Sequence, residues 1–223
     1  MAHPSTPASI SPPKQARSER TLSRLLHAAE ALILEKGLGD VSVSEIVQRA
    51  RSSVGGFYAR FRDKHGLLRA LEERFLSDVS ARLAALADAG RWGDAPLAEI
   101  VDTCAAELVS VTSERRNLIA AFLLRAAEDA TLWADGLRFR RDAEDQIGAL
   151  LRARTAEFSH PEPELAVQLG VQFAFGLVIQ RVLTGEVSAA GRTLTDAELH
   201  REIARNFLSY LGVQAPRLEP TPS

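Results

Sequence analysis

Apolar side chains recur at spacings of three and four along most of the chain, which is the period of one face of an α-helix. The first such segment covers residues 17–36, and Gly37 follows it as a residue that can end a helix in the left-handed conformation. Ala, Leu, Arg and Glu dominate the chain, and β-branched runs are scarce. The pattern therefore predicts an all-α protein. The apolar positions of the first helix are Leu22, Leu25, Leu26, Ala29, Leu32 and Ile33.

The same periodicity predicts eight further helices, the first of which follows Ser42. Ser42 and Glu45 are spaced as in a capping box, in which each residue bonds the other's backbone N–H. Residues 1–16 are rich in Pro and Ser, and residues 214–223 are rich in Pro, so both segments are expected to be disordered. The predicted helices cover 43–50, 54–61, 64–89, 96–113, 117–127, 132–158, 163–183 and 196–211.

Two short predicted helices after a long amphipathic one are typical of a three-helix DNA-binding head. The second contains Gly55 and Gly56, each of which costs about 1 kcal/mol relative to Ala inside a helix. Phe57 and Phe61 lie four residues apart and should face the core, which leaves Tyr58 and its neighbours for other contacts. By spacing alone, this segment is either a DNA-binding motif or a helical hairpin with a Gly-rich turn.

Charge is distributed unevenly along the 223 residues, whose formal net charge is −2. Residues 1–75 carry 12 Lys and Arg against 8 Asp and Glu, whereas residues 76–223 carry 15 against 21. The low net charge argues against an indiscriminate polyanion binder. The basic first third fits a DNA-binding part, although a chance fluctuation of surface charge would look the same.

The run from Val43 to Lys64, with Gly55-Gly56-Phe57-Tyr58-Ala59-Arg60-Phe61 at its centre, resembles the signature of TetR-family transcriptional regulators. The segments Arg20-Thr21-Leu22, Ala28-Ala29-Glu30 and Glu35-Lys36-Gly37 resemble the first helix of that family. The resemblance covers about residues 17–75, and the rest of the chain matches in length and helix count. It implies a DNA-binding domain over 17–75 and a ligand-binding and dimerisation domain over 76–213.

The resemblance also implies roles for single residues. Ser42 would cap the second helix and touch a phosphate, and Tyr58 and Lys64 would hold phosphates. Arg60 would approach a base edge or the backbone of the DNA. The start of the recognition helix, facing the DNA, would comprise Ser53, Val54 and Gly56.

The chain departs from the family pattern at the corner between the two short helices. The family usually has Gly-Val there, and this chain has Arg51 and Ser52. A corner that needs the left-handed conformation is strained with arginine, which makes Arg51 an additional phosphate-contact candidate. Val47 stands where the family has a small residue. The sequence therefore does not determine the orientation of the recognition helix.

In the second domain, residues 163–183 are apolar nearly all round, so this helix must be covered on more than one side. A stripe of small residues on it would allow close approach of a second helix. Together with the last helix it predicts a four-helix homodimer interface, and burial inside one protomer is the alternative. The predicted interface residues are Ala166, Gly170, Ala174, Leu177, Ile203 and Phe207.

The middle helices carry apolar stripes with a few polar residues between them, which suits either a small-molecule pocket or an ordinary helical core. Cys104 is the only cysteine, and we expect a buried small side chain there rather than a redox sensor. The residues proposed for a pocket are Cys104, Phe122, Trp133, Leu137 and Arg140.

Other classes of protein find little support in the sequence. One cysteine excludes an intramolecular disulfide, and the histidines show no metal-ligand spacing. Phosphate-loop, Rossmann and nucleophile-elbow patterns are absent, so neither an enzyme nor a cofactor is expected. No membrane span or secretory signal is expected, and the location is expected to be cytoplasmic.

The sequence therefore predicts a homodimeric regulator, most simply a repressor, that leaves a palindromic operator when a small hydrophobic effector binds. Its expected partners are double-stranded DNA, a second copy of the chain and the effector. The alternative is an all-helical protein–protein interaction module with a vestigial DNA-binding head, which the Arg51-Ser52 corner would favour.

Overall fold

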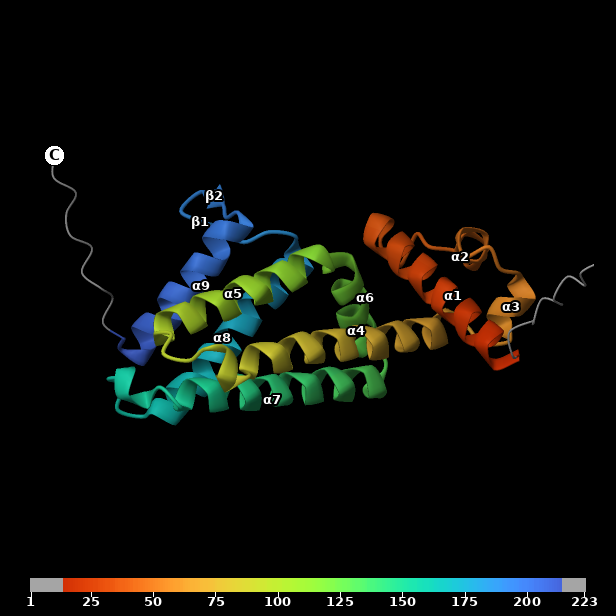
Figure 1. Ribbon diagram of the computed structural model, residues 1–223. Coiled ribbons are helices and arrows are strands. Elements are labelled where there is room, and N and C mark those ends of the chain that lie inside the picture. Colours follow the sequence, from red (N-terminus) through yellow and green to blue (C-terminus); the bar gives the residue numbers. More distant parts are fainter. Residues whose placement is uncertain (1–13, 214–223) are drawn as a thin grey trace, which may run out of the picture. The chain divides into compact units, whose positions relative to one another are not determined.

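The computed structural model describes residues 14–213 and is all-helical apart from one short hairpin, which confirms the predicted fold class (Figure 1). The expectations for residues 1–13 and 214–223 lie outside the described residues. Within the described part, the α-helices are α1 (Lys14–Lys36), α2 (Val43–Arg49), α3 (Val54–Tyr58), α4 (Lys64–Ala87), α5 (Leu97–Glu114), α6 (Arg116–Ala126), α7 (Ala130–Arg152), α8 (Pro163–Thr184) and α9 (Asp196–Leu211).

The chain divides into two compact units after Leu71, inside α4, a few residues before the predicted boundary at residue 75. The first unit holds α1–α3 around an apolar core. Ser42 caps α2 in the predicted capping box, and Gly37 ends α1 with φ +81°, as expected. The largest fully buried side chains of this unit are Leu25, Ile33, Ile46, Phe57, Leu67, Leu68 and Leu71.

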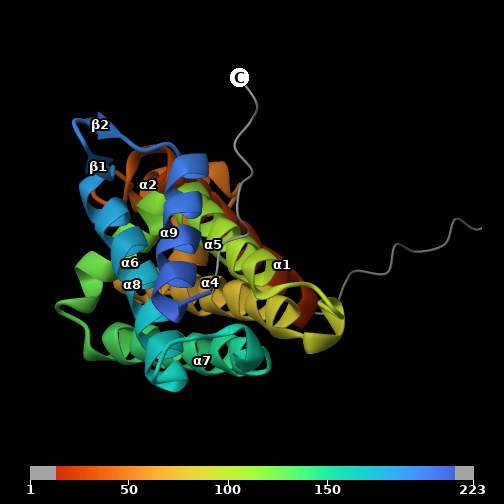
Figure 2. The same cartoon turned by 90° about the vertical axis from the view of Figure 1, so that its left-hand side faces the viewer.

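The second unit packs its helices in pairs, as Figures 1 and 2 show. α9 packs against α5, and α7 contacts α8, which crosses it at an angle. Two of the helices have side-chain caps at their starts: Asp129 caps α7, and Thr195 and Glu198 form a capping box on α9. The apolar faces meet in one core, in which Leu97, Ile100 and Leu199 are fully buried.

Beyond shifts of one or two residues at helix ends, the structure differs from the prediction in four places. α1 begins at Lys14 instead of residue 17, and α3 ends at Tyr58 instead of residue 61. α7 stops at Arg152, after which a 3-10 turn at Thr155–Glu157 lets the Glu157 carboxylate accept the N–H of Leu97 at 3.0 Å. That long-range cap of α5 explains why the helical pattern up to residue 158 is interrupted.

The fourth difference is a hairpin in the predicted loop between α8 and α9. Its strands are β1 (Ser188–Ala189) and β2 (Arg192–Thr193), which pair antiparallel. Ala190 and Gly191 have φ +51° and +78°, the two positive values of a type I′ turn. Alanine at the first of these positions is not a usual turn residue, so the sequence carried little sign of the hairpin.

α8 is the only helix of the described residues that is long and apolar enough to cross a membrane by length and composition alone. Its inner side is covered by the domain itself, because Val167, Val171 and Val178 are buried in the common core. The apolar composition of α8 is that of a core helix.

Candidate nucleic-acid interface and ligand cavity

The corner between α2 and α3 has the left-handed residue that the sequence suggested. Arg51 has φ +48°, a conformation that costs a non-glycine residue about 1–2 kcal/mol. The Ser52 N–H closes the turn on the carbonyl of Val47 at 2.8 Å, and Ser53 caps α3 by accepting the N–H of Gly56 at 3.0 Å. The helix-turn-helix geometry is therefore complete despite the unusual residues.

The two glycines of α3 have different environments. A Cβ at Gly56 would lie 2.9 Å from the Ser52 hydroxyl oxygen and 3.2 Å from that of Ser53, so the glycine makes room for the turn itself. A Cβ at Gly55 would meet no heavy atom within 4 Å. The close Ser52 and Ser53 hydroxyls therefore account for glycine at position 56, whereas the surface at Gly55 is open to another molecule.

The outward face of α3 combines apolar and polar side chains. Val54 is 50% exposed and Tyr58 is 54% exposed, while Phe57 and Phe61 are buried as predicted. The Tyr58 ring stands edge-on to the Phe57 ring at a centroid distance of 5.3 Å, which orients it. Arg51 and Ser53 are also exposed, so this face can supply a guanidinium and two hydroxyls to a phosphate backbone.

The Arg60 guanidinium, predicted to approach the DNA, makes hydrogen bonds within the protein. Its Nη1 donates to the carbonyl of Gly56 at 2.8 Å, and its Nη2 donates to the Ser18 hydroxyl at 3.1 Å and the Ser18 carbonyl at 3.3 Å. Arg60 therefore joins the end of α3 to the start of α1. The periodicity of α3 could not reveal this, since Ser18 lies 42 residues away.

Lys64 is also held by the protein. Its Nζ donates to the carbonyl of Val41 at 2.6 Å and to that of Leu38 at 3.2 Å, which ties the loop before α2 to the start of α4. One of the three ammonium donors remains for a phosphate. The structure thus gives Lys64 a positioning role that the sequence did not suggest.

Ser42 serves mainly as the cap of α2. Its hydroxyl donates to Glu45 at 2.7 Å and accepts the Glu45 N–H at 3.2 Å. The Lys36 ammonium lies 2.6 Å from the other Glu45 carboxylate oxygen, and it lowers the pKa of Glu45 to about 2, together with the bonds from Ser42. The hydroxyl proton of Ser42 is thereby engaged before any phosphate arrives.

The sequence interpretation missed one further feature of the first unit. A shallow depression near the start of α1 is lined by Arg20, Thr21, Ser23 and Arg24. The two arginines are four residues apart on one helix face, a spacing that could have signalled a basic patch. This patch adds a second place at which the basic first unit can meet phosphates.

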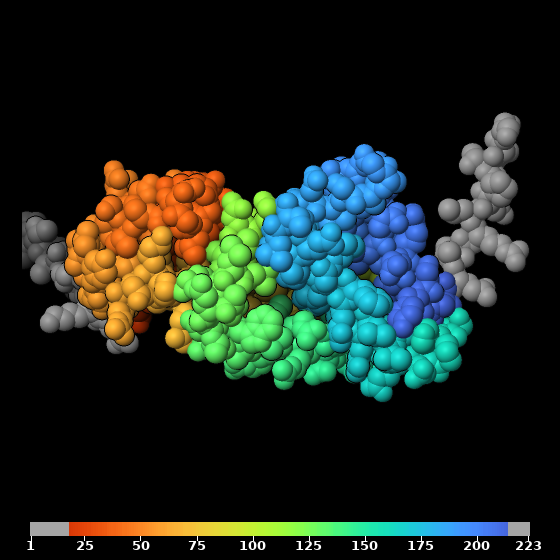
Figure 3. All heavy atoms as spheres, turned by 180° about the vertical axis from the view of Figure 1, so that it is seen from behind, coloured from red at the N-terminus to blue at the C-terminus, as the bar shows by residue number. Residues whose placement is uncertain are grey.

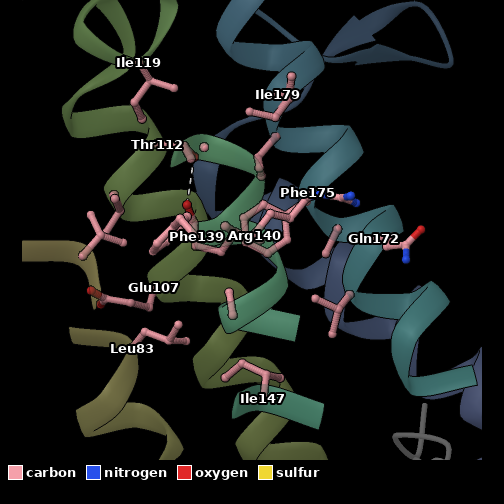
Figure 4. Close-up of a pocket in the computed structure, with 18 of the residues that line it drawn as sticks. Leu83, Glu107, Thr112, Ile119, Phe139, Arg140, Ile147, Gln172, Phe175 and Ile179 are labelled. Carbon is pink, nitrogen blue, oxygen red and sulfur yellow. Dashed lines mark hydrogen bonds between the residues drawn. The ribbon is translucent and has the colours of Figure 1, made fainter. Parts of the chain in front are cut away.

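The second unit encloses a cavity of about 670 Å³ among α4–α9 (Figure 4). All five residues proposed from the sequence line it. Other side chains on its wall come from every one of these helices, which is why a helix-by-helix reading could name only a few of them. They include Phe75, Leu83, Val101, Leu108, Ile119, Phe139, Ile147, Phe175, Ile179 and Phe207.

The cavity wall is overwhelmingly apolar. Burial raises the pKa of the Cys104 thiol to about 11, so the thiol stays protonated at neutral pH and behaves as an apolar group. The Thr112 hydroxyl donates to the carbonyl of Leu108 at 2.8 Å within its own helix. Charged groups at the wall form pairs, Arg82 with Glu107 at 3.3 Å and Arg140 with Glu144 at 3.1 Å.

The cavity reaches the surface beside α7 and α8. Trp133 is 56% exposed, and Gln172 and Gly176 on α8 are exposed as well, although all three line the cavity. Figure 3 shows this side of the unit, with α6 and α7 in green next to α8 in light blue. Trp133 therefore lies at the opening rather than in the interior.

The structure corrects the predicted dimer interface. Ala166, Ile203 and Phe207 are at most 7% exposed and belong to the core of one protomer. A Cβ at Gly170 would lie 2.1 Å from the Phe207 ring, so the small-residue stripe accommodates α9 of the same chain. Ala174 and Leu177 are half-buried against this core, and Ala174 lines the cavity.

The face of α8 that remains uncovered carries large apolar side chains instead. Leu165, Phe173 and Leu183 are 42%, 56% and 52% exposed. The sequence assigned the stripe of small residues to a second copy of the chain, with burial inside one protomer as the alternative. The intramolecular position of Phe207 decides that the small stripe faces inward.

Metal chemistry finds no site in the part of the chain that the structure describes. Between residues 14 and 213, no group of three or more His, Cys, Asp or Glu side chains is arranged to hold a metal ion. The site features are a helix-turn-helix head and a separate helical unit with an apolar cavity. This combination is typical of helix-turn-helix DNA-binding regulators.

Comparison with known proteins agrees with that class. Residues 25–71 match the sequence model of bacterial regulatory proteins of the tetR family. The HTH-type transcriptional regulator YvdT of Bacillus subtilis (strain 168), itself uncharacterized, is 31% identical over 108 residues, which are 48% of this chain and 52% of YvdT. The match thus spans about half the length of that relative.

Solved structures share the whole fold. A protein from Mesorhizobium loti that is assigned to the TetR-family transcriptional regulators has a TM-score of 0.69 at 20% identity, covering 88% of this chain and 98% of that one. RolR, solved in complex with resorcinol, has a TM-score of 0.55 at 24% identity, covering 94% and 99%. Residues 25–71 thus match the tetR-family model, and the described chain shares the fold of these solved structures.

Proposed function

We propose that the protein is a ligand-responsive DNA-binding repressor that acts as a homodimer in the cytoplasm. The observation that carries this proposal is the pairing of a complete helix-turn-helix, with Tyr58 and Val54 on its open face, with a second unit that holds an apolar cavity. The helix-turn-helix unit by itself would only bind DNA, whereas a ligand bound in the cavity would regulate that binding.

The DNA-facing surface is the exposed start of α3. Ser53, Val54 and Tyr58 point away from the head core, and the strained Arg51 stands at the corner before them. Hydroxyl, guanidinium and helix N-terminal N–H groups are suited to phosphate contacts, and an apolar Val54 is suited to a thymine methyl group. The open space at Gly55 allows the helix to approach the groove closely.

The effector site is the cavity of the second unit. Its volume of about 670 Å³ lies within the range of small-molecule sites, about 300–1,000 Å³. RolR, which has the same fold, is described in complex with the small aromatic molecule resorcinol. A hydrophobic effector fits the apolar wall of this chain in the same general way.

The dimer forms through the uncovered face of α8. Leu165, Phe173 and Leu183 are large apolar side chains, and their exposure is explained when a second copy covers them. A two-fold dimer presents two heads to a palindromic operator with half-sites about 34–36 Å apart. The exposed apolar face therefore replaces the small-residue stripe as the proposed interface.

Regulation requires that effector and DNA prefer different states of the dimer. α4 is the element that belongs to both units: it begins with Lys64, which is tied to the head, and continues with Phe75 and Leu83, which line the cavity. A coupling of about 1–3 kcal/mol changes operator affinity by roughly 5–150-fold, and DNA weakens effector binding by the same factor.

A salt-dependent gel shift on DNA flanking the protein's own gene tests the proposal. We expect specific binding whose affinity falls steeply with salt, and an equal loss of affinity for all sequences with Tyr58→Phe. Absence of specific binding would favour the alternative of a protein–protein interaction module. That alternative has lost its original support, because the Arg51-Ser52 corner forms a complete turn.

A further inference from the structure

Most polar groups at the cavity wall are already satisfied by the protein. Arg82 on α4 pairs with Glu107 on α5, and the Thr112 hydroxyl bonds backbone carbonyls of its own helix. Glu72, 5% exposed, takes part in interactions within the protein as well. A ligand in the interior therefore meets few polar atoms that still need a partner.

Arg140 differs from Arg82, whose partner lies on another helix, because the partner of Arg140 lies on α7 itself. Its guanidinium has five N–H donors, and among the described residues its hydrogen-bond partner is Glu144, reached by Nη1 at 3.1 Å. The side chain of Arg140 is 39% exposed, so solvent screens the pair and it contributes little. Arginine placed four residues before glutamate is also the weaker order on a helix. Arg140 thus retains donors for an additional acceptor.

The interior next to Arg140 is lined by aromatic rings. Phe139 precedes Arg140 on α7, Phe175 faces the cavity from α8, and the rings of Phe75 and Phe122 meet at a centroid distance of 5.6 Å (Figure 4). Aromatic side chains bind flat rings through offset-stacked and edge-to-face contacts. The cavity therefore combines an aromatic interior with the partly exposed Arg140 guanidinium at its wall.

We propose that the effector is an aromatic acid, with its ring system in the aromatic interior and its carboxylate or sulfonate on the free N–H groups of Arg140. This inference rests on the proposed role of the cavity as the effector site. A planar guanidinium can bind an acid group through two parallel hydrogen bonds, and charge-assisted bonds are stronger than neutral ones. Glu72 and Glu107, the carboxylates of the wall, both have partners within the protein.

Two fluorescent probes with one ring skeleton test this proposal. 8-Anilinonaphthalene-1-sulfonate carries an acid group, and N-phenyl-1-naphthylamine is the same molecule without it. Both are titrated into the full-length protein and into Arg140→Met, which keeps an apolar side chain of similar length. We expect Arg140→Met to weaken sulfonate binding roughly 10- to 100-fold and to leave the neutral probe within about twofold.

Two further variants serve as controls. Arg141→Met removes an exposed cation from the next position of α7, outside the cavity wall, and should change neither affinity. Gly136→Phe should abolish binding of both probes, because a Cβ at Gly136 meets no heavy atom within 4 Å and the ring can extend into the cavity. Binding that survives Gly136→Phe would place the probes elsewhere and contradict the proposal.

The proposal is overturned if Arg140→Met weakens both probes equally, if it leaves the sulfonate affinity unchanged, or if the wild type binds neither probe. Operator binding by Arg140→Met is measured in parallel by gel shift. Retained operator affinity together with unchanged sulfonate affinity would reject the acid and leave the proposed regulator intact. Loss of specific operator binding in the wild type would reject the proposed function itself.

Discussion

Replacing Gly170 by alanine tests whether the small-residue stripe of α8 faces the same chain. An added Cβ would lie 2.1 Å from Cε2, 2.3 Å from Cδ2 and 2.8 Å from Cζ of Phe207. Ordinary carbon contacts are about 3.5–4.0 Å, so the ring or the helix must move by more than an ångström. Phe207 is only 7% exposed, which limits where the ring can go.

The magnitude follows from two opposing effects. Alanine in place of a helical glycine stabilises by about 1 kcal/mol, whereas overpacking a core costs about 1–3 kcal/mol. Gly136→Ala on α7 is the matched control, because its Cβ meets no heavy atom within 4 Å and only the gain applies. The free energy of unfolding of Gly170→Ala should therefore be about 1–3 kcal/mol lower than that of Gly136→Ala, and its Tm about 2–12 °C lower.

Thermal and urea denaturation at one protein concentration measure this difference, and sedimentation measures the dimer. Removing ring atoms in the double variant Gly170→Ala, Phe207→Leu should recover part of the loss, which would reveal coupling between the two positions. The argument is refuted if Gly170→Ala is as stable as Gly136→Ala. It is also refuted if Gly170→Ala keeps the unfolding free energy of the protomer and only dissociates the dimer.

Further expected outcomes concern the head. Arg51→Gly should raise the free energy of unfolding by up to about 1 kcal/mol, because glycine relieves the strain at φ +48°. If Arg51 holds a phosphate, the same variant should lower the salt slope of DNA binding by about one. An unchanged slope in a gel-shift series would show that Arg51 does not contact the DNA. Lys64→Met should lower the thermal stability of the head by about 1–3 kcal/mol, since two carbonyls lose a charged donor, and calorimetry showing no loss would contradict the positioning role. Glu45, whose pKa is lowered to about 2, stabilises the folded head above pH 4.5, and this contribution is lost as the pH falls from 4.5 towards 2. Glu45→Gln should therefore flatten the acid-unfolding curve in that range. A curve identical to that of the wild type would argue against the bond to Lys36.

Local features of the protein were determined by the sequence itself. The positions of nine helices in the described residues, the capping box of Ser42 and Glu45, and the left-handed ends at Gly37 and Gly212 all depend on residues within one or two turns of each other. The strained corner at Arg51 was foreseeable for the same reason. Periodicity also placed Phe57 in the core, because it reports which residues share a face.

Tertiary structure decided what each face meets. Arg60 bonds Ser18 from 42 residues away, and Lys64 bonds Val41 across a loop, so neither is as free as its position in the motif suggested. The small stripe of α8 fits α9 of the same protomer because the Phe207 ring lies against Gly170. Helix periodicity gives the direction of a side chain around its own axis, whereas its partner depends on how distant helices pack. The cavity, with Arg140 at its wall, exists only where six helices converge.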